Sequence, residues 1–281
     1  MENRNYIYFD VRNSKCFFEQ EEPRRNKRIK PNFDLEKENG VAIYGRELSY
    51  LGKGLNSTVW KYECGGKEYA IKIFFDIGLS CALSLDVYKV MRNLPIKNTL
   101  KALETLKVIN DNENENAKRR RYYAYIMEYL EEQKNSSIVD MPTSILLENT
   151  SILESDAEIL AKNNIVMQDL KTENTIFNKT NSMFYISDID MFQLKRKDAS
   201  IDDTIMHNYT VLQYIFYRFL TRYSTDYYNG IYNDLFEKLL YQDTTHEKSI
   251  TDKLEDLFSP YDTPKQFFKD NKDRYYKKYF R

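Results

Sequence analysis

The sequence predicts an α+β protein, in which a β-rich segment is followed by mainly helical segments. Residues 46–75 alternate apolar and polar side chains around the two-residue turn Gly65-Gly66, a pattern typical of antiparallel strands. A short hairpin is expected between residues 175 and 186. Helices are indicated by apolar side chains at helical spacing in residues 80–93, 151–163 and 204–220.

The charge of the chain is balanced, with 42 Lys+Arg against 43 Asp+Glu in 281 residues. This length suffices for one large domain or two lobes. A general nucleic-acid binder is usually basic, so we expect no nucleic-acid partner. The chain has neither an apolar run of 18 residues nor the apolar core of a secretory signal, so we expect no membrane partner. The expected location is the cytoplasm, or a host cell that receives the protein as an effector.

Cysteine and histidine are too few and too scattered for metal or triad chemistry. The cysteines are Cys16, Cys64 and Cys81, and the histidines are His207 and His246. None has the spacing of a zinc site, and we expect the cysteines to be free thiols in a reducing compartment.

One stretch, residues 165–190, carries the residue types that phosphoryl transfer requires. Asp169, Lys171 and Asn174 precede the expected hairpin, and Asp188 follows it. In such a site one Asp orients or deprotonates the attacking hydroxyl and a Lys lies near the transferred phosphate. An Asn and a second Asp supply oxygen ligands to magnesium, which is a hard cation.

The motif D-L-K-x-x-N at 169–174, followed by I-S-D ending at Asp188, resembles the catalytic and magnesium loops of eukaryotic-type protein kinases. The resemblance implies that Asp169 and Lys171 are catalytic, and that Asn174 and Asp188 bind Mg2+ or Mn2+ with ATP. A single short motif of common residues occurs often by chance, so the interpretation depends on the upstream half of the chain.

A glycine-containing hairpin, LGKGLNSTV at 51–59, matches the phosphate-covering loop of the same family. Gly52 and Gly54 would let backbone N–H groups approach phosphates that a Cβ atom would keep away. Ser57 occupies the usual position of the third glycine. The resemblance implies that Val59 contacts the adenine.

The expected third strand carries Ala70 and Lys72 in the sequence A-I-K, which matches the family's V-A-I-K strand. The resemblance makes Lys72 a catalytic residue that pairs with the α- and β-phosphates, and alternation along the strand places Ala70 on the same face. A buried lysine needs an anionic partner. Asp86 in the helix at 80–93 is the preferred partner, and Glu104 is the alternative.

The apolar segment 122–130 ends in M-E-Y-L and resembles the hinge of protein kinases. There the backbone at Glu128 and Leu130 would hydrogen-bond the adenine, and Met127 would close the back of the pocket. Ile176 would form the apolar floor beneath the adenine.

Five motifs thus occur in the family's order, and the resemblance extends from Leu48 to Leu220. It implies a bilobal protein-kinase-like fold, with a five-stranded sheet and one main helix in the small lobe and a larger, mainly helical lobe. The expected division is an N-terminal extension at 1–40, an N-lobe with hinge at 41–130, and a C-lobe at 131–281. The basic run at 23–31 has two interpretations. It is either a nuclear signal or a contact for an anionic surface, or it is a solvated arm, which we favour.

The chain departs from the family pattern around the magnesium loop. Met167-Gln168 stands where the family has H-R, and Asp190 replaces the glycine of D-F-G. No A-P-E follows in the short segment before Asn208, which lies near the position of an aspartate in the family's central helix.

Three functions are compatible with these motifs. A Ser/Thr-type protein kinase acting on a protein substrate is favoured by Lys171, which follows Asp169 by two residues. A small-molecule kinase of the aminoglycoside or choline type would explain the missing peptide platform. A pseudokinase that binds a nucleotide without catalysis is disfavoured, because the polar site residues and Lys72 are all retained.

Overall fold

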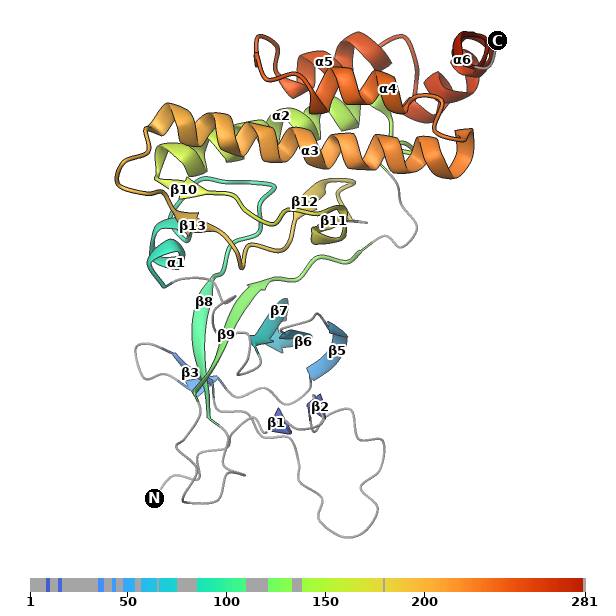
Figure 1. The fold of residues 1–281 in the computed structure, drawn as a ribbon. Helices are drawn as coiled ribbons and strands as arrows, with labels where there is room; N and C mark the ends of the chain where they lie inside the picture. Colours follow the sequence, from blue (N-terminus) through green and yellow to red (C-terminus); the bar gives the residue numbers. More distant parts are fainter. Residues whose placement is uncertain are drawn as a thin grey trace, which may run out of the picture. The chain divides into compact units, whose positions relative to one another are not determined.

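The computed structural model describes two compact units (Figure 1). Unit 1 comprises Met1–Ala82 and Lys101–Tyr129, and unit 2 comprises Leu83–Leu100 and Leu130–Arg281. The described residues are 9–10, 15–16, 35–37, 42–43, 48–53, 57–64, 66–74, 85–109, 121–132, 138–178 and 180–279.

Unit 1 is built on an antiparallel sheet, in which the described residues form seven strands in the order β4-β3-β8-β9-β7-β6-β5. A separate pair, β1 (Phe9–Asp10) and β2 (Lys15–Cys16), is also antiparallel. The strands of the sheet are β3 (Leu35–Lys37), β4 (Ala42–Ile43), β5 (Leu48–Lys53), β6 (Ser57–Cys64), β7 (Lys67–Phe74), β8 (Glu104–Ile109) and β9 (Arg121–Glu128).

The three predicted strands of residues 46–75 are β5, β6 and β7. Cys64 pairs with Lys67, so two residues connect β6 to β7, and Gly66 has the positive φ of 75° that such a turn requires. The sheet exceeds the five strands expected because β3 and β4 extend it beyond β8. These strands of three and two residues are too short for a period-two pattern; β3 pairs with the edge of β8, and β4 pairs with β3.

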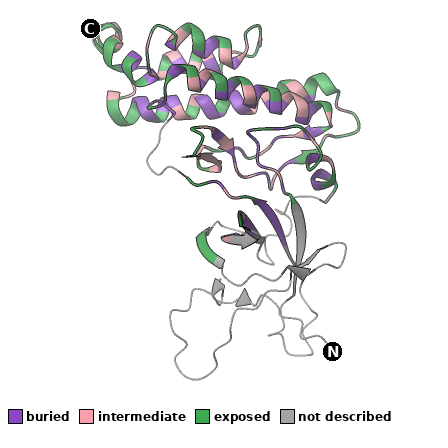
Figure 2. Ribbon diagram, turned by 180° about the vertical axis from the view of Figure 1, so that it is seen from behind, coloured by how far each residue is buried: buried purple, intermediate pink, exposed green. Residues whose placement is uncertain are grey.

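Strand β7 lies between β6 and β9 and is buried on both faces (Figure 2). Ile71 and Phe74 are almost fully buried, and Trp60 on β6 donates an indole hydrogen bond to Thr58 Oγ1 at 3.0 Å. The central position of β7 explains why its apolar run is continuous rather than strictly alternating.

Unit 2 consists mainly of helices around two long ones, α2 (Thr143–Lys162) and α3 (Ile201–Tyr228), which pack on each other. Its remaining helices are α1 (Leu85–Met91), η3 (Thr172–Asn174), α4 (Asn233–Phe236), the π-helix η4 (Glu237–Tyr241), α5 (Ile250–Phe258) and α6 (Pro264–Tyr279). Its strand pairs are β10 (Ile165–Val166) with β13 (Gln193–Leu194), and β11 (Thr175–Phe177) with β12 (Phe184–Ile186).

Helix α1 groups with unit 2, whereas the sequence analysis assigned it to the N-terminal lobe. The following segment explains this grouping. The buried carboxylate of Asp156 on α2 accepts hydrogen bonds from the backbone N–H groups of Lys97, Asn98 and Thr99 at 2.7–2.8 Å. Burial raises the pKa of Asp156, and these donors oppose that increase. They tie the segment after α1 directly to α2.

Both long helices extend beyond their predicted ranges. Helix α3 starts at a capping box, in which Ser200 accepts from the Asp203 N–H and Asp203 accepts from the Ser200 N–H. It ends at Asn229, whose φ of 53° is the left-handed conformation of a helix C-cap. None of the described helices is both long and apolar enough to cross a membrane.

The side chain of Asn208 on α3 joins three segments of unit 2. Its Oδ1 accepts from the Met167 N–H at 2.9 Å, and its Nδ2 donates to the carbonyls of Ala157 (3.1 Å) and Ile165 (3.0 Å). Asn208 is fully buried. Because this side chain must donate as well as accept, an ionised aspartate of nearly the same shape could not make the same hydrogen bonds.

We therefore predict that Asn208→Asp lowers the free energy of unfolding by about 2–4 kcal/mol at neutral pH, because a buried carboxylate would face two carbonyl oxygens. The pKa of the new carboxyl would be raised in the folded state, so stability should rise as the pH falls through that pKa. Urea denaturation at several pH values measures both effects. Asn181→Asp on the exposed β11–β12 turn is the matched control, and equal losses in the two variants would contradict the prediction.

A second buried polar contact holds α5 in place. The Lys253 Nζ atom lies 2.6 Å from Asp243 Oδ2 and donates to Gln213 Oε1 at 3.3 Å, and the lysine side chain is only 3% exposed. The hydrogen bond from Lys253, together with those from Thr245, holds the pKa of Asp243 well below its usual range.

We predict that Asp243→Asn lowers the free energy of unfolding by about 3–5 kcal/mol, because it leaves the Lys253 charge buried without a counter-ion. The lowered pKa also means that the native state binds fewer protons than the unfolded chain. Wild-type stability should therefore decrease as the pH falls below the ordinary aspartate pKa of about 4, and this component should be absent from the variant. Asp256→Asn, which breaks the exposed pair with Lys248, should have little effect in the same denaturation experiment.

Candidate active site

The predicted catalytic loop leaves β10 at Val166 and is fixed at its first residue. Met167 is fully buried, and its N–H donates to Asn208 while its carbonyl accepts from His207 Nε2 at 2.9 Å. Met167-Gln168, which stands where the family has H-R, therefore lies in a loop that hydrogen bonds from α3 hold in place.

Asp169 follows with an exposed carboxylate and a left-handed backbone, at φ 51°. This conformation is uncommon for a residue other than glycine and concentrates at functional sites. The next side chain, Leu170, is buried and turns into the core. The backbone therefore presents Asp169 outward while anchoring the loop on both sides of it.

Lys171 lies directly against Asp169. Its Nζ is 2.8 Å from Asp169 Oδ1 and 3.0 Å from Oδ2, so the ammonium spans both carboxylate oxygens. The hydrogen bond to Asp169 is the main cause that raises the pKa of Lys171, and the charge of Asp188 adds to it. Two of the three residues predicted to be catalytic are thus brought together.

Asn174 closes the same loop, since its Nδ2 donates to the Asp169 carbonyl at 2.8 Å. This bond orients the amide, and within the described part of the chain its Oδ1 atom accepts no hydrogen bond. The oxygen is therefore available to a hard cation.

The β11–β12 hairpin brings Asp188 next to Asn174. Thr175 pairs with Ile186, and the Ser187 N–H donates to the Asn174 carbonyl at 2.8 Å, so the residues that flank the hairpin lie opposite each other. Asp188 Oδ1 accepts from the Asp190 N–H at 3.3 Å. The predicted metal ligands are thus adjacent, as local hairpin pairing dictates.

Two side chains that the sequence analysis did not identify support this hairpin. The buried Asn149 on α2 accepts from the Phe184 N–H at 2.6 Å, and Asp156 holds the segment whose Asn98 carbonyl accepts from the Ile186 N–H at 2.9 Å. Both contacts join segments distant in sequence, so no local pattern could reveal them.

A magnesium ion is compatible with the donor set of this loop. Among the described residues no three His, Cys, Asp or Glu side chains cluster as a metal site. Asn174 and Asp188 offer an amide and a carboxylate oxygen, and Mg2+ usually takes one or two protein ligands together with phosphate oxygens and water.

The side chains of unit 1 that are predicted to contact a nucleotide lie on one face of its sheet. Val59 is opposite Lys72, and Ala70 is opposite Met127, in antiparallel pairs whose side chains share a face. Lys72 is 8% exposed, with its Nζ 5.6 Å from the Phe74 ring centroid. The alternation along β7 therefore places the lysine beside the predicted adenine contacts.

Gly52 lies opposite Val59, and a Cβ atom built on it would meet nothing within 4 Å. Gly54 lies outside the described residues, so its predicted role stays a prediction.

The acidic partner of Lys72 also stays a prediction. Asp86 is exposed on α1, which belongs to unit 2, and the side chain of Glu104 at the start of β8 is outside the described residues.

The predicted hinge residues differ in exposure. Met127 and Leu130 are buried, while Glu128 at the end of β9 is exposed and pairs through its backbone with Tyr69. Ile176 is half-buried on β11. Contact of any of these residues with adenine is a prediction.

Comparisons with known proteins find similar solved structures but no matching family model or curated protein. No protein-family model matches the chain, and no curated protein matches it. Among solved structures, the kinase PK-1 of Cydia pomonella granulovirus is similar, with 17% identity and a TM-score of 0.45. The match covers 74% of this chain and 92% of the granulovirus chain.

The order of the elements in each unit agrees with the order of the motifs that they carry. In unit 1 the strand with Lys72 lies between the glycine hairpin and the M-E-Y-L strand. In unit 2 a long helix precedes the D-L-K-x-x-N loop, a hairpin leads to Asp188, and a second long helix supports the loop through Asn208. The chain thus has the α+β class that the sequence predicts, with a small β-rich part and a larger, mainly helical part, and its elements follow the order that the resemblance to protein kinases implies.

Proposed function

We propose that this chain is an ATP-dependent phosphotransferase that transfers the γ-phosphate of Mg-ATP to a Ser or Thr hydroxyl of a protein. The observation that carries the proposal is the grouping of Asp169, Lys171 and Asn174 in one loop, where Lys171 contacts the Asp169 carboxylate at 2.8–3.0 Å and Asn174 contacts the Asp169 carbonyl at 2.8 Å. Phosphoryl transfer needs positioned charges more than covalent participation by the protein, and this loop positions its charges through buried backbone contacts.

In the proposed reaction, the exposed carboxylate of Asp169 accepts the hydrogen bond of the acceptor hydroxyl and receives its proton. The acceptor oxygen forms a bond to the γ-phosphorus, and the bond between that phosphorus and the bridging oxygen of ADP breaks. Lys171, beside Asp169, stabilises the negative charge of the phosphoryl oxygens. Lys72 contacts the α- and β-phosphates, as the sequence motif implies.

Asn174 and Asp188 hold the metal in this proposal. A magnesium ion held by these two residues would supply positive charge that offsets the negative charge of the phosphate groups. The hydrogen bond from Asn174 Nδ2 to the Asp169 carbonyl would couple the position of the metal ligand to that of the proton acceptor.

We predict that Asp169→Asn lowers kcat for transfer from γ-labelled ATP by about 10²–10⁴-fold, because the proton acceptor is lost. Lys72→Met should also abolish most of the transfer, since the phosphates lose a charged contact.

A protein substrate, the chain itself and a panel of amino alcohols are offered in parallel. Asp198→Asn is the matched control, because Asp198 is an exposed aspartate in the same unit. Label on amino alcohols alone would contradict a protein acceptor, and full activity of Asp169→Asn would contradict the proposed mechanism.

We also predict that Asp188→Asn weakens magnesium-dependent nucleotide binding more than metal-free binding, because Mg2+ prefers a charged oxygen ligand. Titration of a fluorescent ATP analogue with and without Mg2+ measures this difference without any turnover. Asp198→Asn again serves as the control, and an unchanged magnesium dependence in Asp188→Asn would remove this residue from the metal site.

A further inference from the structure

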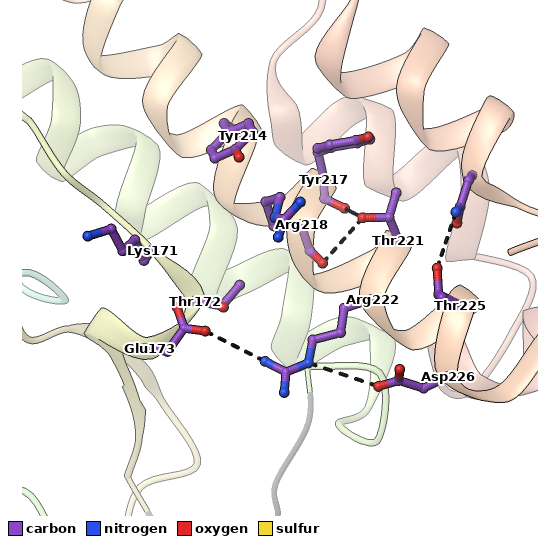
Figure 3. Close-up of a pocket in the computed structure, with 11 residues that line it drawn as sticks. Lys171, Thr172, Glu173, Tyr214, Tyr217, Arg218, Thr221, Arg222, Thr225 and Asp226 are labelled. Carbon is purple, nitrogen blue, oxygen red and sulfur yellow. Dashed lines mark hydrogen bonds and ion pairs between the residues drawn. The ribbon is translucent and has the colours of Figure 1, made fainter.

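A groove in unit 2 lies beside the proposed catalytic loop, with a volume of about 720 Å³ (Figure 3). One wall is formed by Lys171, Thr172 and Glu173 of the loop. The other is formed by α3, with Arg218 and Arg222 among its lining residues. Because Lys171 contacts Asp169 at 2.8 Å, a molecule in the groove would lie close to the proposed proton acceptor.

The two arginines occupy successive turns of α3, four residues apart, and therefore share one side of the helix. Figure 3 shows both guanidinium groups on the side of α3 that faces the loop. Each guanidinium presents a planar set of donors that matches a carboxylate or phosphate. Their spacing suits an extended anionic segment rather than one small ion.

Arg222 is held only loosely. Its Nη1 lies 3.7 Å from Glu173 Oε1 and its Nε lies 3.9 Å from Asp226 Oδ2, in exposed pairs at the upper limit of an ion-pair distance. Exposed pairs of this kind contribute little stability. An incoming carboxylate could therefore exchange with either partner at small cost.

Arg218 has no acidic partner. In the part of the chain that the structure describes it makes no ion pair, and its guanidinium lies 6.0 Å from the centroid of the Tyr214 ring. Tyr214 and Tyr217 also line the groove, and Tyr217 stacks on Tyr241 with ring centroids 5.1 Å apart. The charge of Arg218 also acts on Glu173, whose pKa it helps to lower. The groove combines this cation with an aromatic wall, which suits a peptide better than a free ion.

We propose that this groove binds acidic residues that flank the acceptor hydroxyl, so that the preferred substrate is an acidic peptide, with carboxylate or phosphate side chains. This inference rests on the proposed phosphotransferase function. A basic flanking residue would meet Arg218 and Lys171, while the two carboxylates that line the groove, Glu173 and Asp226, both already face Arg222.

The first test compares peptides of equal length that carry one serine flanked by Glu, phosphoserine, Ala or Lys. We expect kcat/KM of the wild-type chain to be about tenfold higher for the Glu peptide than for the Ala peptide, which corresponds to one additional charge-assisted contact. The phosphoserine arm distinguishes a phosphate from a carboxylate as the preferred anion. Equal rates for all peptides, or a preference for the Lys peptide, would overturn the proposal.

The second test reverses the charge of the groove. Arg218→Glu and Arg222→Glu should each lower kcat/KM for the Glu peptide through a higher KM, and should increase kcat/KM for the Lys peptide. An increase for one substrate cannot result from misfolding. Arg274→Glu, on an exposed position of α6, is the matched control and should keep the wild-type preference. Parallel losses for all peptides would contradict the role assigned to the arginines.

A binding measurement separates this inference from the proposed function. Fluorescence anisotropy of the labelled Glu peptide is measured with the full chain and with Arg218→Glu. Peptide binding that Arg218→Glu abolishes, without transfer to any acceptor, would support the groove and refute the phosphotransferase. Transfer to the Ala peptide together with no preferential binding of the Glu peptide would refute the groove and leave the phosphotransferase standing.

Discussion

The hydrogen bonds of Asn208 are the contact on which the rest of the candidate site depends. One amide connects α3 to the end of β10, to the loop that leaves it, and to the backbone of α2. All of its partners are backbone groups, which would be costly to leave unpaired in the core. Asp169 lies two residues after Met167, whose N–H donates to Asn208. Its left-handed backbone conformation is thus held by these buried hydrogen bonds rather than by the intrinsic preference of an aspartate.

The charges of the loop follow from this anchoring. Asp169 and Lys171 form an exposed ion pair, which alone would contribute little to stability. The position of this ion pair is what matters, because the same loop carries Asn174 and the hairpin brings Asp188 next to Asn174. The adjacent groove extends the charge pattern along α3, where Arg222 faces Glu173 and Arg218 faces an aromatic ring. Chemistry and acceptor choice would therefore depend on two neighbouring elements of one unit.

Sequence reasoning succeeded where the signal was local. The strand pairing around Gly66, the hairpin between Asn174 and Asp188, and the alternation that places Lys72 beside Ala70 all follow from a period of two and a turn. It was less complete for β3 and β4, which are too short to show a period, and for the first two turns of α2, where Thr143 is held by contacts with residues 261 and 262. The grouping of α1 with unit 2 likewise depends on Asp156, far along the chain.

The sequence by itself determined which chemical groups the protein offers and in which order, because carboxylates, an amide and lysines at fixed spacings are written directly in its motifs. It also determined the α+β class, since apolar periodicity distinguishes strands from helices. Only the tertiary structure decided that Asn208 donates as well as accepts, that Asn149 and Asp156 support the hairpin, and that Arg218 and Arg222 face the loop at Glu173. The physical reason is that each of these contacts joins segments that are distant in sequence, and a local pattern holds no record of which buried backbone group a distant side chain will satisfy.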